Sequence, residues 1–266
     1  IPAAYLLFES ISRPPASFDQ PSSRSSNDEG SGAVRIVRDF AEPHLELVRL
    51  LREAAEIEHS LLVQYLFGAF SVKPQYAELV GYGDPNSNDL LGVAIQEMFH
   101  LSSVNELLVA LGAVPVLARQ DFPYEPDIYP FQLMLEPLSR GSVAKYVYTE
   151  APVDALNLRK LDLSLVSATQ DRHFIQELEK TLGTQVRPNH VGSLYDKVIA
   201  TFKEFCSVGN EIDNPQDWLD KLNVIKEEGE HGHFLFFKSV FMGTHKAFRG
   251  NRTIWRLPAS DPRYPS

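Results

Sequence analysis

Residues 90–112 read LLGVAIQEMFHLSSVNELLVALG, and in this stretch an acid, Glu97, lies among apolar residues that recur every three or four positions. On a helix that turns by about 100° per residue, such positions form one face. His100 follows Glu97 by three residues and lies one turn along that face. The stretch therefore predicts a helix that ends at Gly112 and carries a Glu-x-x-His pair on its buried side. The apolar residues around Glu97 are Leu90, Val93, Ala94, Leu101, Val104, Leu108 and Leu111.

Two further segments repeat this pattern. In residues 47–70, LVRLLREAAEIEHSLLVQYLFGAF, Glu58 is central to the apolar face. In residues 218–241, WLDKLNVIKEEGEHGHFLFFKSVF, Glu230 lies on the apolar face and His233 follows it by three residues. An ionised carboxylate alone in an apolar interior costs several kcal/mol or takes up a proton. Three such acids in one core predict a bound cation.

The predicted ligands are therefore Glu58, Glu97, His100, Glu230 and His233, and carboxylate oxygens with imidazole nitrogens favour iron or manganese. Zinc is the alternative for a closed site of four ligands. Glu227 lies at the edge of its apolar face and is kept as a further candidate ligand. Other acids of these helices are expected to face solvent, namely Glu53, Glu56, Glu106 and Glu228.

A fourth helix is expected over HVGSLYDKVIATFKEF, residues 190–205, and it breaks the pattern. Its acids, Asp196 and Glu204, point away from its apolar face. His190 at one edge and Tyr195 on the inner face could approach a metal, although a core tyrosine more often has a structural role. The sequence thus leaves open an asymmetric pair of ions or a single ion.

Composition bounds the possible partners. The 266 residues are 44% hydrophobic and carry a net charge of −10, which argues against nucleic acid or an anionic membrane as partner. No apolar run reaches the roughly 18 residues that span a bilayer, and no secretory signal is recognised at the N-terminus. Cys206 is the only cysteine, so a disulfide framework is not expected and a cytoplasmic location is the default.

The chain is expected to have three parts: a flexible arm over residues 1–40, a bundle over 41–246 and a tail over 247–266. The first bundle helix begins near Glu42 and Pro43 and stops before Lys73. Residues 116–189 contain no long amphipathic helix by periodicity and are interpreted as a crossover that covers one end of the bundle. Tyr124 and Tyr129 in this insertion are the expected contacts of a substrate, unless such aromatic residues only pack the insertion against the bundle.

Several stretches, in order, resemble one family. They are LREAAEIEHSLLVQYLFGAF (51–70), IQEMFHLSSVNELLVALGAVPVL (95–117), LEPLSRGSVAKYVYTEAP (135–152), HVGSLYDKV (190–198) and EEGEHGHFLFF (227–237). Over roughly residues 45–241 the chain resembles the ferritin-like domain of iminophenylpyruvate dimer synthases and related small proteins. The resemblance implies an all-α, ferritin-like four-helix bundle with a long crossover insertion between helices two and three. It also implies a metal centre and oxidative coupling of amino-acid-derived imines. The family often has an acid where this chain has Ser193.

The function expected from these observations is that of an iron-dependent oxidoreductase, with one or two irons, acting on a small organic and amino-acid-derived substrate. Two alternatives stay open: a ferritin-like protein that binds or stores iron, and a metal-free interaction bundle in which the acids pair with Lys226 or with each other. A homo-oligomer is compatible with each of the three.

Overall fold

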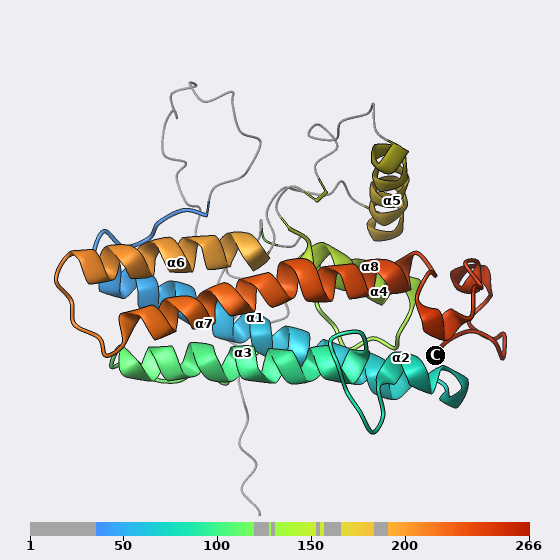
Figure 1. Cartoon of the computed structure of the whole chain (residues 1–266), viewed down its shortest axis with the longest axis horizontal. Helices are drawn as coiled ribbons and strands as arrows, with labels where there is room; N and C mark the ends of the chain where they lie inside the picture. Colours follow the sequence, from blue (N-terminus) through green and yellow to red (C-terminus); the bar gives the residue numbers. More distant parts are fainter. Residues whose placement is uncertain (1–35, 120–127, 129–130, 153–154, 157–165, 184–190) are drawn as a thin grey trace, which may run out of the picture. The chain divides into compact units, whose positions relative to one another are not determined.

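The computed structural model describes residues 36–119, 128, 131–152, 155–156, 166–183 and 191–266, with the backbone alone over 166–170 (Figure 1). Residues 33–266 form one compact unit, to which everything below refers. All regular elements of the described residues are helical, with no strand among them. The expected all-α fold is therefore confirmed. None of the described helices is long and apolar enough to cross a membrane.

The first two long helices, α1 (Pro43–Ser71) and α3 (Leu90–Ala110), form an antiparallel hairpin (Figure 1). The Glu42 side chain caps α1 by accepting from the backbone N–H of Leu45, and Pro43 occupies the first turn. Asp89 caps α3 in the same way at Gly92. The bounds of α1 are those expected from the sequence, whereas α3 ends at Ala110, just before the expected end at Gly112. Between the two helices lie η1 (Pro74–Tyr76) and α2 (Ala77–Val80).

The last helix of the bundle is one rod made of three parts. It consists of α7 (Pro215–Glu227), a π-helical segment η3 (Glu228–His233) and α8 (Phe234–Phe241), which follow one another in line (Figure 1). A π-helix bonds each residue to the fifth along the chain, so its side chains leave the regular α-helical register. This shift of register bears directly on Glu230 and His233.

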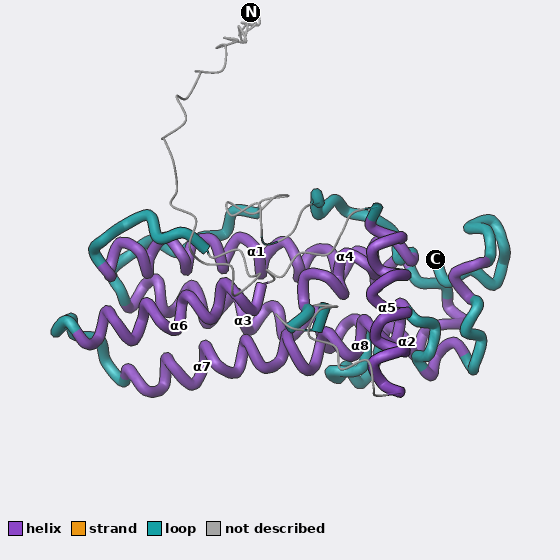
Figure 2. The backbone as a smooth tube through the Cα atoms, turned by 90° about the horizontal axis from the view of Figure 1, so that it is seen from above, coloured by secondary structure: helices purple, strands orange, loops and turns teal. Residues whose placement is uncertain are grey.

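The remaining side of the bundle is built from two separate helices. The helix α6 (Val191–Ser207) packs against α1 and α7, whereas α4 (Arg140–Glu150) packs against α8 (Figure 2). The C-terminal end of α4 and the N-terminal end of α6 therefore both come close to η3. This side of the bundle is therefore interrupted between α4 and α6.

The interpretation of residues 116–189 as a segment without a long helix is wrong. It contains α4 and also α5 (Val166–Leu182), which is as long as α6. Moreover α4 is a helix of the bundle itself, and its residues from Ser142 to Glu150 are buried except Lys145. A helix buried almost all round has no one-sided apolar stripe, so its periodicity is invisible in the sequence.

Residues 247–266 belong to the same unit and are joined to its helices. They include η4 (Lys246–Phe248, which begins one residue earlier) and η5 (Ile254–Arg256). The indole N–H of Trp255 donates to the backbone carbonyl of Val240 at 2.8 Å, and the backbone N–H of Lys73 donates to that of Pro265 at 2.8 Å. These bonds join the end of the chain to α8 and to the residues after α1.

Candidate metal centre

Four carboxylates and imidazoles expected from the sequence do meet in the core, together with one that was not expected. Glu58 comes from α1, Glu97 and His100 from α3, and His233 from the end of η3. The fifth residue, Glu150, is the last residue of α4. All five are at most 5% exposed.

These residues form two ligand groups that share one acid. Glu58, Glu97 and His100 are the first ligand group, and Glu97, Glu150 and His233 are the second ligand group. Within each group the candidate ligand atoms lie within 4.8 Å of one another. Glu97 contributes to both groups because its two oxygens face opposite histidines: Oε2 lies 3.0 Å from Nδ1 of His100, and Oε1 lies 2.9 Å from Nδ1 of His233.

The two remaining acids complete the groups at longer range. Oε2 of Glu58 lies 3.5 Å from Nδ1 of His100, and Oε1 of Glu150 lies 3.6 Å from Nδ1 of His233. The imidazole rings of His100 and His233 are stacked, with centroids 5.7 Å apart. Both histidines therefore turn the same ring nitrogen, Nδ1, toward the acids.

The other ring nitrogen of each histidine points outward to an acceptor. Nε2 of His100 lies 2.8 Å from Oε2 of Glu228, and Nε2 of His233 lies 3.2 Å from Oε1 of Gln96. Histidines that bind metals almost always donate their second N–H to a carboxylate or carbonyl, which fixes the tautomer and the ring orientation. In a neutral ring whose Nε2–H is donated outward, the lone pair of Nδ1 is left to bind a metal.

Two buried atoms of the centre have no hydrogen-bond partner within the described part of the chain: Oε1 of Glu97 and Nδ1 of His233. They are 2.9 Å apart, but their orientation does not form a hydrogen bond. Buried polar atoms are nearly always satisfied, and a bound cation would satisfy this oxygen and this nitrogen together. The donor set, three carboxylates and two imidazoles, suits iron or manganese.

The charges of the centre are strongly coupled. Burial, together with the charge of Glu97, raises the pKa of Glu58 to about 8, and the same two causes raise the pKa of Glu150. Burial opposes ionisation of Glu97 as well, but the charges of His233 and His100 outweigh it and hold its pKa well below the usual range. Although burial acts against it, Glu97 raises the pKa of His233 to about 10 and also raises that of His100.

The sequence did not identify Glu150. The resemblance to the family places a fourth acid at the position of Ser193, on α6. In the structure the additional acid comes from α4 instead. The available signal was weak: Glu150 is the only acid of an otherwise largely apolar segment, GSVAKYVYTE, directly before Ala151 and Pro152.

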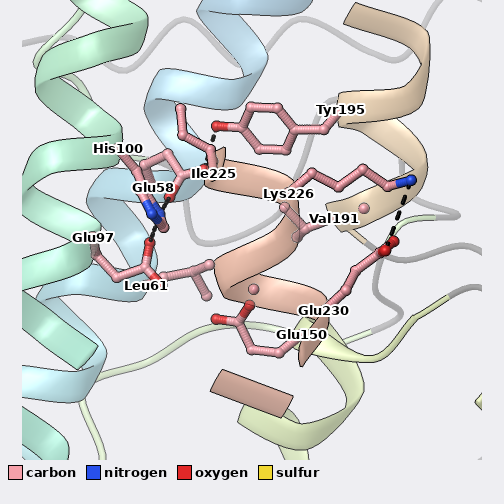
Figure 3. Close-up of a pocket in the computed structure, with 12 residues that line it drawn as sticks. Glu58, Leu61, Glu97, His100, Glu150, Val191, Tyr195, Ile225, Lys226 and Glu230 are labelled. Atoms are coloured by element: carbon pink, nitrogen blue, oxygen red, sulfur yellow. Dashed lines mark hydrogen bonds and ion pairs between the residues drawn. The ribbon is translucent and has the colours of Figure 1, made fainter. Parts of the chain in front are cut away.

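Glu230 is corrected from a core ligand to a residue at the rim. Its side chain is 13% exposed, lies in neither ligand group and approaches Nζ of Lys226 at 3.7 Å. Figure 3 shows these two side chains directed toward each other, away from His100 and Glu97. The i+3 spacing to His233 assumes an α-helix, and η3 is π-helical. The same change brings Glu228, expected to face solvent, to His100.

Other expected residues fall as follows. Tyr195 is buried and donates a hydrogen bond to Oε1 of Glu58. Glu227 is exposed, pairs with His231 at 3.3 Å and belongs to neither ligand group. Glu53, expected to face solvent, is buried because α1 is covered by both α3 and α6. His190, Tyr124 and Tyr129 lie outside the described residues.

A pocket opens onto the centre at the interruption between α4 and α6 (Figure 3). Glu58, Glu97, His100 and Glu150 line it on the side of the centre. The other lining residues include Val191, Gly192, Tyr195, Ile225, Lys226 and Glu230. The pocket therefore lies against the first ligand group and Glu150.

Comparison with known proteins gives a consistent result. The model of the family described as ferritin-like matches residues 51–240. The chain is 33% identical over 154 residues to the dichlorochromopyrrolate synthase of Lentzea aerocolonigenes, which covers 48% of this chain and 15% of that protein. It is 32% identical over 152 residues to the 2-imino-3-(indol-3-yl)propanoate dimerase of Chromobacterium violaceum, covering 46% of this chain and 14% of that protein. The chain thus matches about one seventh of the length of these curated relatives. No solved structure matches it.

Proposed function

The chain belongs to the ferritin-like family, and on this premise we propose that it is an iron-dependent oxidoreductase that acts on a small, amino-acid-derived substrate in specialised metabolism. The observation that carries the proposal is the pair of ligand groups joined by Glu97. Sharing one acid between two groups lets a single helix, α3, serve two ions. Manganese is the alternative metal, since the same hard ligands suit it.

Each residue of the centre has a distinct task in this proposal. Glu97 would contact both ions, and Glu58 and Glu150 would each complete one group. Donation from Nε2 of His100 to Glu228, and from His233 to Gln96, keeps Nδ1 of each ring available as the ligand atom. Iron bound here would supply one-electron redox chemistry toward dioxygen or peroxide. The substrate would approach the metals from the side of the pocket at the interruption between α4 and α6.

The substrate class is proposed from the relatives. One is named for the synthesis of dichlorochromopyrrolate and the other for the dimerisation of 2-imino-3-(indol-3-yl)propanoate. We extend this chemistry to the present chain as an activity on an imino or oxo acid derived from an amino acid. Lys226, which lines the pocket and pairs with Asp196 at 2.7 Å, would be the cation that meets such a carboxylate.

Iron binding tests the proposal directly. Metal-free protein titrated anaerobically with Fe(II), followed by measurement of bound iron after gel filtration, should hold up to two ions per chain. Glu97→Gln should remove tight binding at both groups yet leave the bundle folded, because a buried neutral amide costs less than an unpaired carboxylate. The matched control is Glu106→Gln, an exposed acid of the same helix that pairs with Lys221. Iron content that is unchanged in Glu97→Gln, or absent in the unsubstituted protein, would contradict the proposal.

A second assay addresses the substrate. Iron-loaded protein should consume dioxygen or peroxide faster when a 2-imino acid generated from an aromatic amino acid is present, and Glu97→Gln should abolish the difference. Product formation is followed by mass spectrometry, with Glu106→Gln again as the control. If iron is bound but no imino or oxo acid changes the rate, the metal site stands and the proposed substrate class falls.

A further inference from the structure

Two buried tyrosines donate hydrogen bonds to the centre, each to a different acid. The hydroxyl of Tyr65 donates to Oε1 of Glu150, and that of Tyr195 donates to Oε1 of Glu58. Both tyrosines are at most 1% exposed. Glu150 belongs only to the second ligand group and Glu58 only to the first. Tyr195 therefore contacts only the first ligand group, through Glu58, and Tyr65 contacts only the second, through Glu150.

We propose that Tyr195 and Tyr65 are positioning residues. Tyr195 fixes Glu58 in the first ligand group and Tyr65 fixes Glu150 in the second, so that the affinities of the two groups for their ions are set separately. The inference rests on the proposed function, since it assigns roles toward the metals. It goes beyond the ligand set because neither phenol belongs to either group of candidate ligands. The chemistry is that of an outer-shell donor, whose loss costs about 10- to 100-fold in metal affinity.

The bonds cross between helices, which is what a positioning role requires. Tyr195 on α6 holds Glu58 on α1, whereas Tyr65, also on α1, holds Glu150 on α4 (Figure 3 shows the first pair). Neither bond can form within one helix, so each depends on the packing of two. Glu58 uses Oε1 for Tyr195 and turns Oε2 toward His100 at 3.5 Å. The phenol thereby selects which carboxylate oxygen is presented to the first group.

Packing alone does not account for the two hydroxyls. The neighbouring Tyr146 has the same burial and its ring lies 4.9 Å from that of Tyr65, yet its hydroxyl donates to the backbone carbonyl of Gln64 at 3.3 Å. It touches no acid of the centre. Tyr146 is thus an internal comparison: a core tyrosine with a structural hydrogen bond, in the same aromatic cluster.

The test measures each group by itself. Glu150→Gln disables the second group and leaves the first, and Glu58→Gln does the reverse. In each background, Tyr195→Phe, Tyr65→Phe and the control Tyr146→Phe are titrated with Fe(II) under anaerobic conditions. With Glu150→Gln, Tyr195→Phe should weaken binding about 10- to 100-fold and Tyr65→Phe should leave it unchanged. With Glu58→Gln, the two results should exchange. Tyr146→Phe should change neither.

Selectivity separates positioning from general loosening of the core. A merely structural role would weaken both groups together, in step with the unfolding midpoint of the metal-free protein, which is measured in parallel. If a phenylalanine variant does not fold, 4-fluorophenylalanine at that position fills the space without donating, and 4-aminophenylalanine restores a donor and should restore the affinity.

The outcomes distinguish this inference from the function on which it rests. Absence of iron binding in the unsubstituted protein would overturn the proposed function and the inference with it. Normal binding in the unsubstituted protein, with equal losses in both groups or with no loss in either phenylalanine variant, would overturn the inference alone. Loss confined to the expected group in each background supports it.

Discussion

At the scale of the residue, the ligand side chains of the metal-free centre carry protons, because the pKa values of Glu58, His100 and His233 are raised. Glu97 is ionised between two imidazoles whose pKa values it raises, to about 10 for His233. Glu58, with a pKa of about 8, keeps its proton at neutral pH because it is buried beside Glu97. The metal-free core thus satisfies its charges with bound protons, and these protons compete with any cation for the same atoms.

Metal binding is therefore predicted to release protons. In the metal-free protein, pH 7 lies below the raised pKa values of His100, His233 and Glu58. Each of these side chains must therefore give up a proton to become a ligand. Raising the pH through about 8 and toward 10 removes this competition, so the apparent affinity should rise with pH. Calorimetric titration with Mn(II) at pH 7, in buffers of different ionisation enthalpy, counts the protons directly.

The variant Glu58→Gln tests how many of the released protons come from the first ligand group. Glu58→Gln disables the first ligand group, so neither Glu58 nor His100 gives up a proton to a metal there, and the variant should release about two protons fewer than the unsubstituted chain. A binding enthalpy that does not depend on the buffer would show that the ligands are already deprotonated, and this account of the metal-free centre would be wrong.

Most residues of the centre could be predicted from the sequence, and those that could not have identifiable reasons. Glu58, Glu97 and His100 lie on regular α-helices with one buried face, where an acid among apolar residues is conspicuous. Glu150 lies on a helix with no exposed face to contrast with it. Tyr65, a core residue by its pattern, gave no sign of its bond to Glu150, because that bond depends on tertiary packing.

At the scale of the element, the π-helical segment η3 decides which acid of the last helix serves the centre. It keeps His233 inside, moves Glu230 to the rim beside Lys226 and brings Glu228 to His100. Gly229 and Gly232 lie within it, and glycine tolerates a departure from the α-helix at less cost than other residues. Two glycines in the middle of a helix were the available signal of this irregularity.

Removal of the Glu228 carboxylate should therefore weaken the first ligand group. In Glu228→Ala, Nε2 of His100 loses its acceptor at 2.8 Å, and metal affinity of that group should fall about 10- to 100-fold. The measurement is Fe(II) titration in the Glu150→Gln background, where only the first group remains. Glu227→Ala, which removes the adjacent but exposed acid, is the control and should have no effect. Equal losses in the two variants would indicate a general effect of charge near the pocket.

The ends of helices can be predicted from sequence where local residues determine them. The bounds of α1 and α3 follow from capping residues and from proline and glycine at their ends, which are local signals. The division of one bundle side between α4 and α6 is not local. It depends on two segments about forty residues apart, of which neither completes the side alone.

At the scale of the whole molecule, the centre draws its ligands from four separate elements of the unit. Its ligands lie at positions 58, 97, 100, 150 and 233, so α1, α3, α4 and η3 all contribute. The interruption between α4 and α6 leaves one side of the bundle without a continuous helix at this level. A cation there would replace the missing continuity with bonds between the helices.

Metal removal should accordingly lower the stability of the entire unit. A ligand that binds only the folded state adds about 2.7 kcal/mol at a free concentration 100 times its Kd, which corresponds to a rise of roughly 5–10 °C in Tm for a unit of this size. Thermal unfolding of Mn(II)-loaded protein, before and after treatment with a chelator, measures the shift. Glu97→Gln should show no chelator-dependent shift because it has lost the acid common to both groups, while Glu106→Gln should behave as the unsubstituted chain. An equal shift in Glu97→Gln would place the stabilising ion elsewhere, since no group of the centre is complete without this acid.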